Sequence, residues 1–126
     1  MTTKQIDAAR HTARIEALVG IEDAVRLRSI ARSLHRLSEA QCNGYQDWRG
    51  NWDEAAEKRA EAREEKLEAK ATAIAKAHGL NLYVQGDPRG APLYLWSQAD
   101  KDTRTGGAWR EYPIDSCYSS IGTAIY

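Results

Sequence analysis

The segment GLNLYVQGDPRGAPLYLW, residues 79–96, is where the hydrophobic period of the chain changes from about 3.6 residues to about 2. On both sides of its GDPRGA centre, aliphatic residues alternate with polar or aromatic ones, a pattern typical of β-strands. Asp87, Pro88 and Gly90 stand at the positions that a type I turn favours for these residues. The segment therefore predicts a β-hairpin.

The predicted hairpin has two chemically different faces, because alternate side chains of a strand point to opposite sides of a sheet. The aliphatic face, which is expected to meet the helices, consists of Leu82, Val84, Leu93 and Leu95. The aromatic face contains Tyr83, Tyr94 and Trp96. This second face has three interpretations: another buried surface, a contact with a second protein, or a platform on which nucleic-acid bases stack.

Two helices are predicted before the hairpin, and Gly20 separates them. Apolar residues recur every three or four positions between Thr3 and Leu18, which indicates an amphipathic helix. A second helix is expected from about Glu22, whose negative charge suits a first helical turn, to the Asn43-Gly44 pair.

A third predicted helix is long and covers approximately residues 51–78. Asn51 and Glu54 resemble a capping box at its start, and Gly79 is expected to end it. Trp52 is expected on its apolar side, together with a row of alanine and leucine residues.

Two connecting loops complete the chain. Residues 45–50 are aromatic, polar and glycine-containing, and we expect Tyr45 and Trp48 to pack against the fold. Residues 98–107 form a polar loop, after which alternation returns over 121–126 as a third strand.

These elements predict the α+β class. The N-terminal helices, three in number and including the long one, are expected to pack on one face of a small three-stranded antiparallel sheet formed by the C-terminal part. The 126 residues fit a single domain, 1–126, with a helical part at 1–79 and the hairpin and last strand at 80–126.

Composition excludes several classes of protein. Apolar residues make up 42% and charged residues 29%, which is unlike a disordered or membrane-embedded chain. Lys plus Arg and Asp plus Glu number 18 each, so no net charge attracts nucleic acid or anionic lipid. No signal peptide or membrane span is visible, and Cys42 and Cys117 are interpreted as reduced thiols, so the sequence favours a cytosolic protein.

Four side chains of the second predicted helix share one side: Arg28, Arg32, His35 and Arg36. This basic stripe is a candidate site for phosphate groups or for an acidic partner protein. The alternative interpretation is a solvated face that pairs with the acidic side of the third helix.

The third predicted helix separates its charges onto two sides. Glu57, Glu61, Glu64 and Glu68 lie on one side, and Arg59, Arg63, Lys66 and Lys70 lie roughly opposite. Like charges at four-residue spacing repel each other, so we expect an antiparallel helix pair, within the chain or across a homodimer, to hold these sides. The alternative interpretation is that these sides are solvated.

No catalytic template fits the sequence. The chain lacks GxGxxG, GxxxxGK[ST], GxSxG and HExxH motifs, and its histidines are scattered along the helices. We therefore expect no enzyme activity, no cofactor and no metal. Turn chemistry explains Asp87 but not Arg89, so Arg89 is the better candidate for contact with a molecule outside the chain.

Three motifs in order carry a resemblance: CNG at the end of one helix, HG at the end of the next, and GDPRGAPLYLW. Over approximately residues 30–96, the chain resembles small accessory, non-virion proteins of tailed bacteriophages and prophages. The resemblance implies a non-enzymatic protein that binds a host protein in the host cytoplasm. Inhibition of a host defence or metabolic complex, as by proteins of the anti-CRISPR class, is among the functions implied.

The partner-binding residues expected from the sequence are Arg28, Arg32, His35, Arg36, Tyr83, Arg89, Tyr94 and Trp96. A nucleic-acid-binding accessory protein that uses the basic stripe is the alternative function, and a small enzyme is the third.

Overall fold

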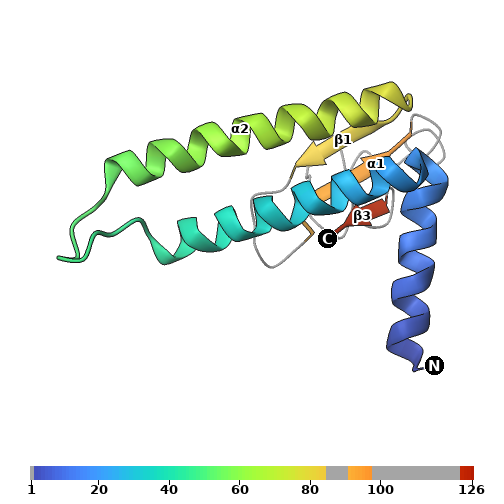
Figure 1. Cartoon of the computed structure of the whole chain (residues 1–126), viewed down its shortest axis with the longest axis horizontal. Helices are drawn as coiled ribbons and strands as arrows, with labels where there is room; N and C mark the ends of the chain where they lie inside the picture. Colours follow the sequence, from blue (N-terminus) through green and yellow to red (C-terminus); the bar gives the residue numbers. More distant parts are fainter. Residues whose placement is uncertain (1, 85–90, 98–122) are drawn as a thin grey trace, which may run out of the picture.

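The computed structural model describes residues 2–84, 91–97 and 123–126. The described elements are α1 (Thr3–Asn43), α2 (Glu54–Ala77), β1 (Asn81–Val84), β2 (Leu93–Trp96) and β3 (Thr123–Ile125) (Figure 1). The predicted DPRG turn with Arg89, the polar loop at 98–107 and Cys117 lie outside the described residues.

Helix α1 bends sharply at Gly20, where the two helices predicted before residue 44 meet. Gly20 has φ 82° and ψ 168°, although the residues on both sides of it are helical. Figure 1 shows the N-terminal part of α1 turning away from the rest of the helix. Among the described residues there are therefore two helices and not the expected three, because the predicted break is a kink within one element and no loop separates its halves.

Helix α2 starts later than the sequence suggested. Its N-cap is Asp53, whose carboxylate accepts a hydrogen bond from the Ala56 amide at 3.0 Å. The expected cap, Asn51, lies instead in the preceding loop. The expected end at Gly79 is confirmed, since its amide donates to the Lys76 carbonyl and the Leu80 amide donates to the Ala75 carbonyl.

The two helices run antiparallel and form a helical hairpin beside the sheet (Figure 1). A contact between His78 Nε2 and Asp23 Oδ2, at 2.7 Å, joins the end of α2 to α1 just after the kink. Hydrogen bonds from His78 and from Arg26 lower the pKa of Asp23. The predicted antiparallel helix pair is thus present within the chain.

The described strands form a sheet of order β1-β2-β3. Both strand pairs are antiparallel, as predicted. Leu82 is paired with Leu95 and Tyr83 with Tyr94, while Leu93 is paired with Ile125. This register places the aliphatic residues of neighbouring strands on the same face.

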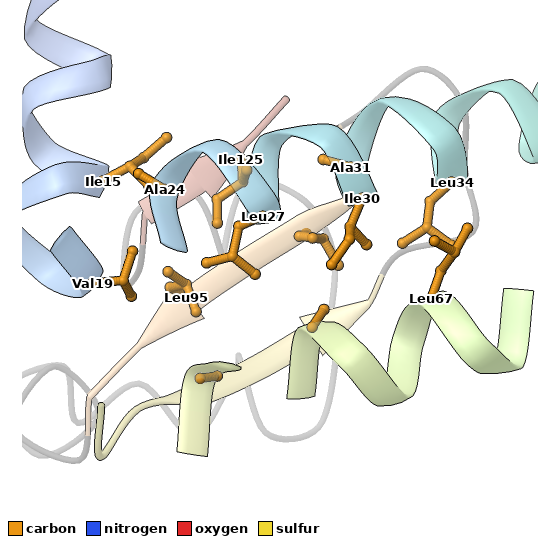
Figure 2. Close-up of a cluster of buried hydrophobic side chains, with 13 residues drawn as sticks. Ile15, Val19, Ala24, Leu27, Ile30, Ala31, Leu34, Leu67, Leu95 and Ile125 are labelled. Carbon is orange, nitrogen blue, oxygen red and sulfur yellow. The ribbon is translucent and has the colours of Figure 1, made fainter. Parts of the chain in front are cut away.

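One core joins both helices to the aliphatic face of the sheet (Figure 2). Its buried members are Ile15, Val19, Ala24, Leu27, Ile30, Ala31, Leu34, Leu67, Ala71, Ala75, Leu93, Leu95 and Ile125. A smaller buried cluster of Ala91 and Tyr94 has Tyr83, Trp96 and Ala124 packed against it. The α+β class and the packing of helices on one sheet face therefore follow the sequence pattern.

Neither of the two described helices combines the length and the apolar character needed to cross a membrane.

Candidate interaction surface

The loop between α1 and α2 is a small, hydrogen-bonded hairpin at the end of the helical pair that is distant from the sheet (Figure 1). Gln46 and Trp52 form an antiparallel bridge. The Asp47 amide donates to the Asn51 carbonyl at 2.7 Å, and the Asp53 amide donates to the Tyr45 carbonyl at the same distance. The loop thus has a defined shape set by its own backbone.

Asp47 organises the turn at the tip of this loop. Its Oδ1 accepts hydrogen bonds from the amides of Arg49 at 2.8 Å and Asn51 at 3.0 Å. The Gly50 amide donates to the Asp47 carbonyl at 3.0 Å, and Gly50 has φ 81°. Asp at the first position and Gly at the fourth are what a type I turn favours, so residues 47–50 have the right chemistry for it.

Trp48 stands at the apex of the turn with 87% of its surface exposed. The Arg49 guanidinium carbon lies 4.6 Å from the centroid of the Trp48 ring, within the range of a cation–π contact. The expectation that Trp48 packs against the fold is wrong, because most of its surface is in solvent.

Two further aromatic residues lie behind the apex. Trp52 is 53% exposed, and its indole Nε1 donates to Glu57 Oε2 at 2.7 Å. The half-buried Tyr45 ring meets Trp52 edge-on, with 5.9 Å between centroids. Trp52 is therefore in the loop, not on the apolar side of α2 as expected. We call Tyr45, Trp48, Arg49 and Trp52 the aromatic tip.

Carboxylates of α2 surround the base of the aromatic tip. Burial and the charges of Glu64, Glu57 and Glu61 raise the pKa of Tyr45. Within the described part of the chain, no ion pair connects this acidic side of α2 to the basic stripe of α1. The antiparallel pairing of the helices is thus made by apolar side chains and not by those charges.

The basic stripe predicted from the sequence is partly occupied by contacts within the chain. His35 Nε2 lies 2.9 Å from Glu39 Oε1, and Arg36 Nη2 donates to Ser33 Oγ at 3.3 Å. Arg32 is exposed.

Arg28, the first member of the stripe, spans the kink in α1. Its Nη1 donates to Thr12 Oγ1 at 3.1 Å, which joins the second part of the helix to the first. His11 lies beside it, with its ring 5.4 Å from that of Tyr126. Burial, with the charges of Arg28 and Arg14, lowers the pKa of His11. Arg28 therefore has a structural role at this position.

The aromatic sheet residues differ in exposure. Tyr94 is only 2% exposed, whereas Tyr83 and Trp96 are half-buried. The rings of Tyr83 and Tyr94 are 6.3 Å apart and tilted. For Tyr94, the structure agrees with the interpretation of a second buried surface, and Tyr83 and Trp96 keep part of their surface in solvent.

The structure does not gather into one site those predicted residues that it describes. Arg28, His35 and Arg36 have neighbours on α1, and the aromatic residues belong to the sheet. The aromatic tip was missed, although its signal was present: DWRG at 47–50 fits the same turn rule that was applied to DPRG.

Among the described residues, no group of three or more His, Cys, Asp or Glu side chains is arranged to hold a metal ion. Comparison of the chain with models of protein families, with curated proteins and with solved structures finds no match.

Proposed function

We propose that this chain is a non-enzymatic binding protein that contacts another protein through the aromatic tip. The observation that carries this proposal is the 87% exposure of Trp48 on a turn fixed by Asp47. Tryptophan and arginine are the residues most enriched among those that dominate the binding energy of protein interfaces.

The loop that carries the aromatic tip is held by its own hydrogen bonds. Backbone bonds close the loop, and the contact between Arg49 and Trp48 limits the freedom of both side chains. A surface that loses little conformational entropy on binding retains more of its contact energy as affinity. Trp48 would bury most of its ring in a pocket of the partner, with Arg49 at the rim.

The resemblance to phage accessory proteins supplies the biological setting of the proposal. In that setting the partner is a protein of the bacterial host, met in the host cytoplasm, and the outcome is inhibition of a defence or metabolic complex. A homodimer through the helices and a nucleic-acid partner are the competing assignments.

The test is recovery of partners by the tagged chain from bacterial lysate, with and without nuclease. The wild-type chain is compared with Trp48→Ala and with Tyr126→Ala, a control that removes another exposed aromatic ring far from the tip. We expect a stoichiometric, nuclease-resistant protein whose recovery falls at least about tenfold for Trp48→Ala, as for a central interface residue, and is kept by Tyr126→Ala.

Two results would overturn the proposal. Equal recovery by both variants would remove the tip from the interface. Recovery that depends on nucleic acid would favour the nucleic-acid-binding alternative instead. Circular dichroism spectra of both variants should match the wild type, because neither side chain belongs to the main core.

A further inference from the structure

A second surface, separate from the aromatic tip, is a trough between α1 and α2. Its volume is about 630 Å³, and its described lining comes from the two helices alone. No residue of the aromatic tip belongs to it.

The floor of the trough is apolar, and small residues border it on α1. Ile30 and Leu67 lie at the bottom, where they also belong to the main core. Ser29 and Ser33 on α1 are small, so they leave the space open above this floor. Val25 on the same helix is 64% exposed, which is a high exposure for an aliphatic side chain that borders a core.

The length of the trough and the spacing of its lining residues fit the packing of another helix. Its α2 wall extends from residue 63 to residue 74, about 16 Å of helix. Lining residues recur along α1 at positions 25, 29 and 33, a four-residue step. Such rows accept the side-chain ridges of another helix packed alongside.

The charge on the rim is of one sign. Arg26, Arg63 and Lys70 line the trough, and its described lining contains no carboxylate. Arg26 is held by Asp23 at 2.8 Å. Within the described residues, Arg63 and Lys70 have no ion-pair partner, so two cations remain along the α2 wall.

We propose that this trough binds an acidic amphipathic helix of a partner protein, as the third helix of a bundle. Apolar residues of the bound helix would cover Ile30, Leu67 and Ile74, and its flanking carboxylates would meet Arg63 and Lys70. Opposite charge then selects the partner.

The probe is a fluorescein-labelled peptide of about 18 residues with leucine at i, i+3, i+4 and i+7 and glutamate on both flanks. A matched peptide has lysine in place of every glutamate. Fluorescence anisotropy with the full chain, at about 150 mM salt, should show saturable binding of the acidic peptide at least about tenfold tighter than the basic one.

The double variant Arg63→Glu with Lys70→Glu should weaken binding of the acidic peptide about tenfold or more, because both rim charges reverse. Its matched control, Lys58→Glu with Lys76→Glu, changes the net charge of α2 equally but lies outside the trough. Ser29→Trp should also weaken binding, since it fills the trough from an exposed position.

Three results of the peptide-binding assay would overturn the proposal: no saturable binding, equal binding of the acidic and basic peptides, or equal loss in the two double variants. Sedimentation of the chain alone tests a competing occupant. A dimer that Arg63→Glu with Lys70→Glu dissociates would assign the trough to a second copy of this chain. The tip variant Trp48→Ala should bind the peptide normally, so this proposal and the one above can fail independently.

Discussion

The two ends of the helical hairpin are stabilised differently. At the sheet end, α1 and α2 bury leucine, isoleucine and alanine side chains against β2 and β3 (Figure 2). Toward the aromatic tip, none of the described residues from 35 to 66 is buried. Partly buried Leu37 and the hydrogen bonds of the interhelical loop hold that end together.

This difference separates a scaffold, the sheet end, from a projecting arm, residues 35–66. Burial of a leucine or isoleucine side chain stabilises a fold by about 1.5–3 kcal/mol, and those contributions are concentrated at the sheet end. The arm can therefore vary in sequence, or close on a partner, with small effects on folding. It also carries the aromatic tip, whose defined turn gives local order without a local core.

The largest expected effect comes from comparing leucines of the same helix at the two ends. Leu27→Ala should lower the free energy of unfolding by about 2–5 kcal/mol, because Leu27 is 0% exposed within the core. Leu37→Ala should cost only about 1 kcal/mol, since that side chain is partly buried. Urea unfolding with a common m-value measures both. Equal losses would mean that the arm has a core of its own.

An intermediate effect is expected at the kink. Gly20→Ala should cost about 1–3 kcal/mol, because φ 82° with ψ 168° is open essentially to glycine alone. An added Cβ would meet no atom within 4 Å, so the cost arises from the backbone and not from packing. Thermal unfolding shows whether Gly20→Ala lowers or raises the stability of the chain. In an unbroken helix the same change would raise the free energy of unfolding, by up to about 1 kcal/mol. A more stable variant would contradict the kink.

The sheet end was predictable because its signals are local and repeated. Alternation over 80–84 and 93–96 indicated the strands and assigned the aliphatic face to the helices, and the observed register agrees. Gly20 was correctly identified as a break. Its result, one kinked helix in place of two separate ones, depends on how Arg28 and the core hold the first part of α1, which no periodicity encodes.

The arm was less predictable because the same residues can form either the interhelical loop or the first turn of α2. Asn51 has good capping chemistry, yet its backbone is used by the bonds to Asp47, so the cap moves to Asp53. Trp48 was expected to be buried only because it is a large aromatic residue. Its exposure follows from the turn, and a turn rule applied to Asp47 and Gly50 would have found it.

The smallest expected effect concerns the acidic side of α2. Burial and the neighbouring Glu64 raise the pKa of Glu68 above its ordinary value. A carboxyl whose pKa is raised by folding favours the folded state below the ordinary value, and this contribution is lost as the pH rises through the raised value. Glu68→Gln should therefore stabilise the chain at pH 7, by about 0.3 kcal/mol for the removal of a like-charge pair one turn apart.

Thermal unfolding at neutral pH and near pH 4 measures this prediction, because the gain should vanish at the lower pH, where Glu68 is largely protonated in both states. Glu65→Gln is the matched control: it removes the same charge from an exposed position on the same helix, and its gain should be smaller. An equal gain in both variants would assign the effect to the net charge of α2. A larger gain in Glu68→Gln would assign the effect to the position of Glu68, which is partly buried and lies beside Glu64.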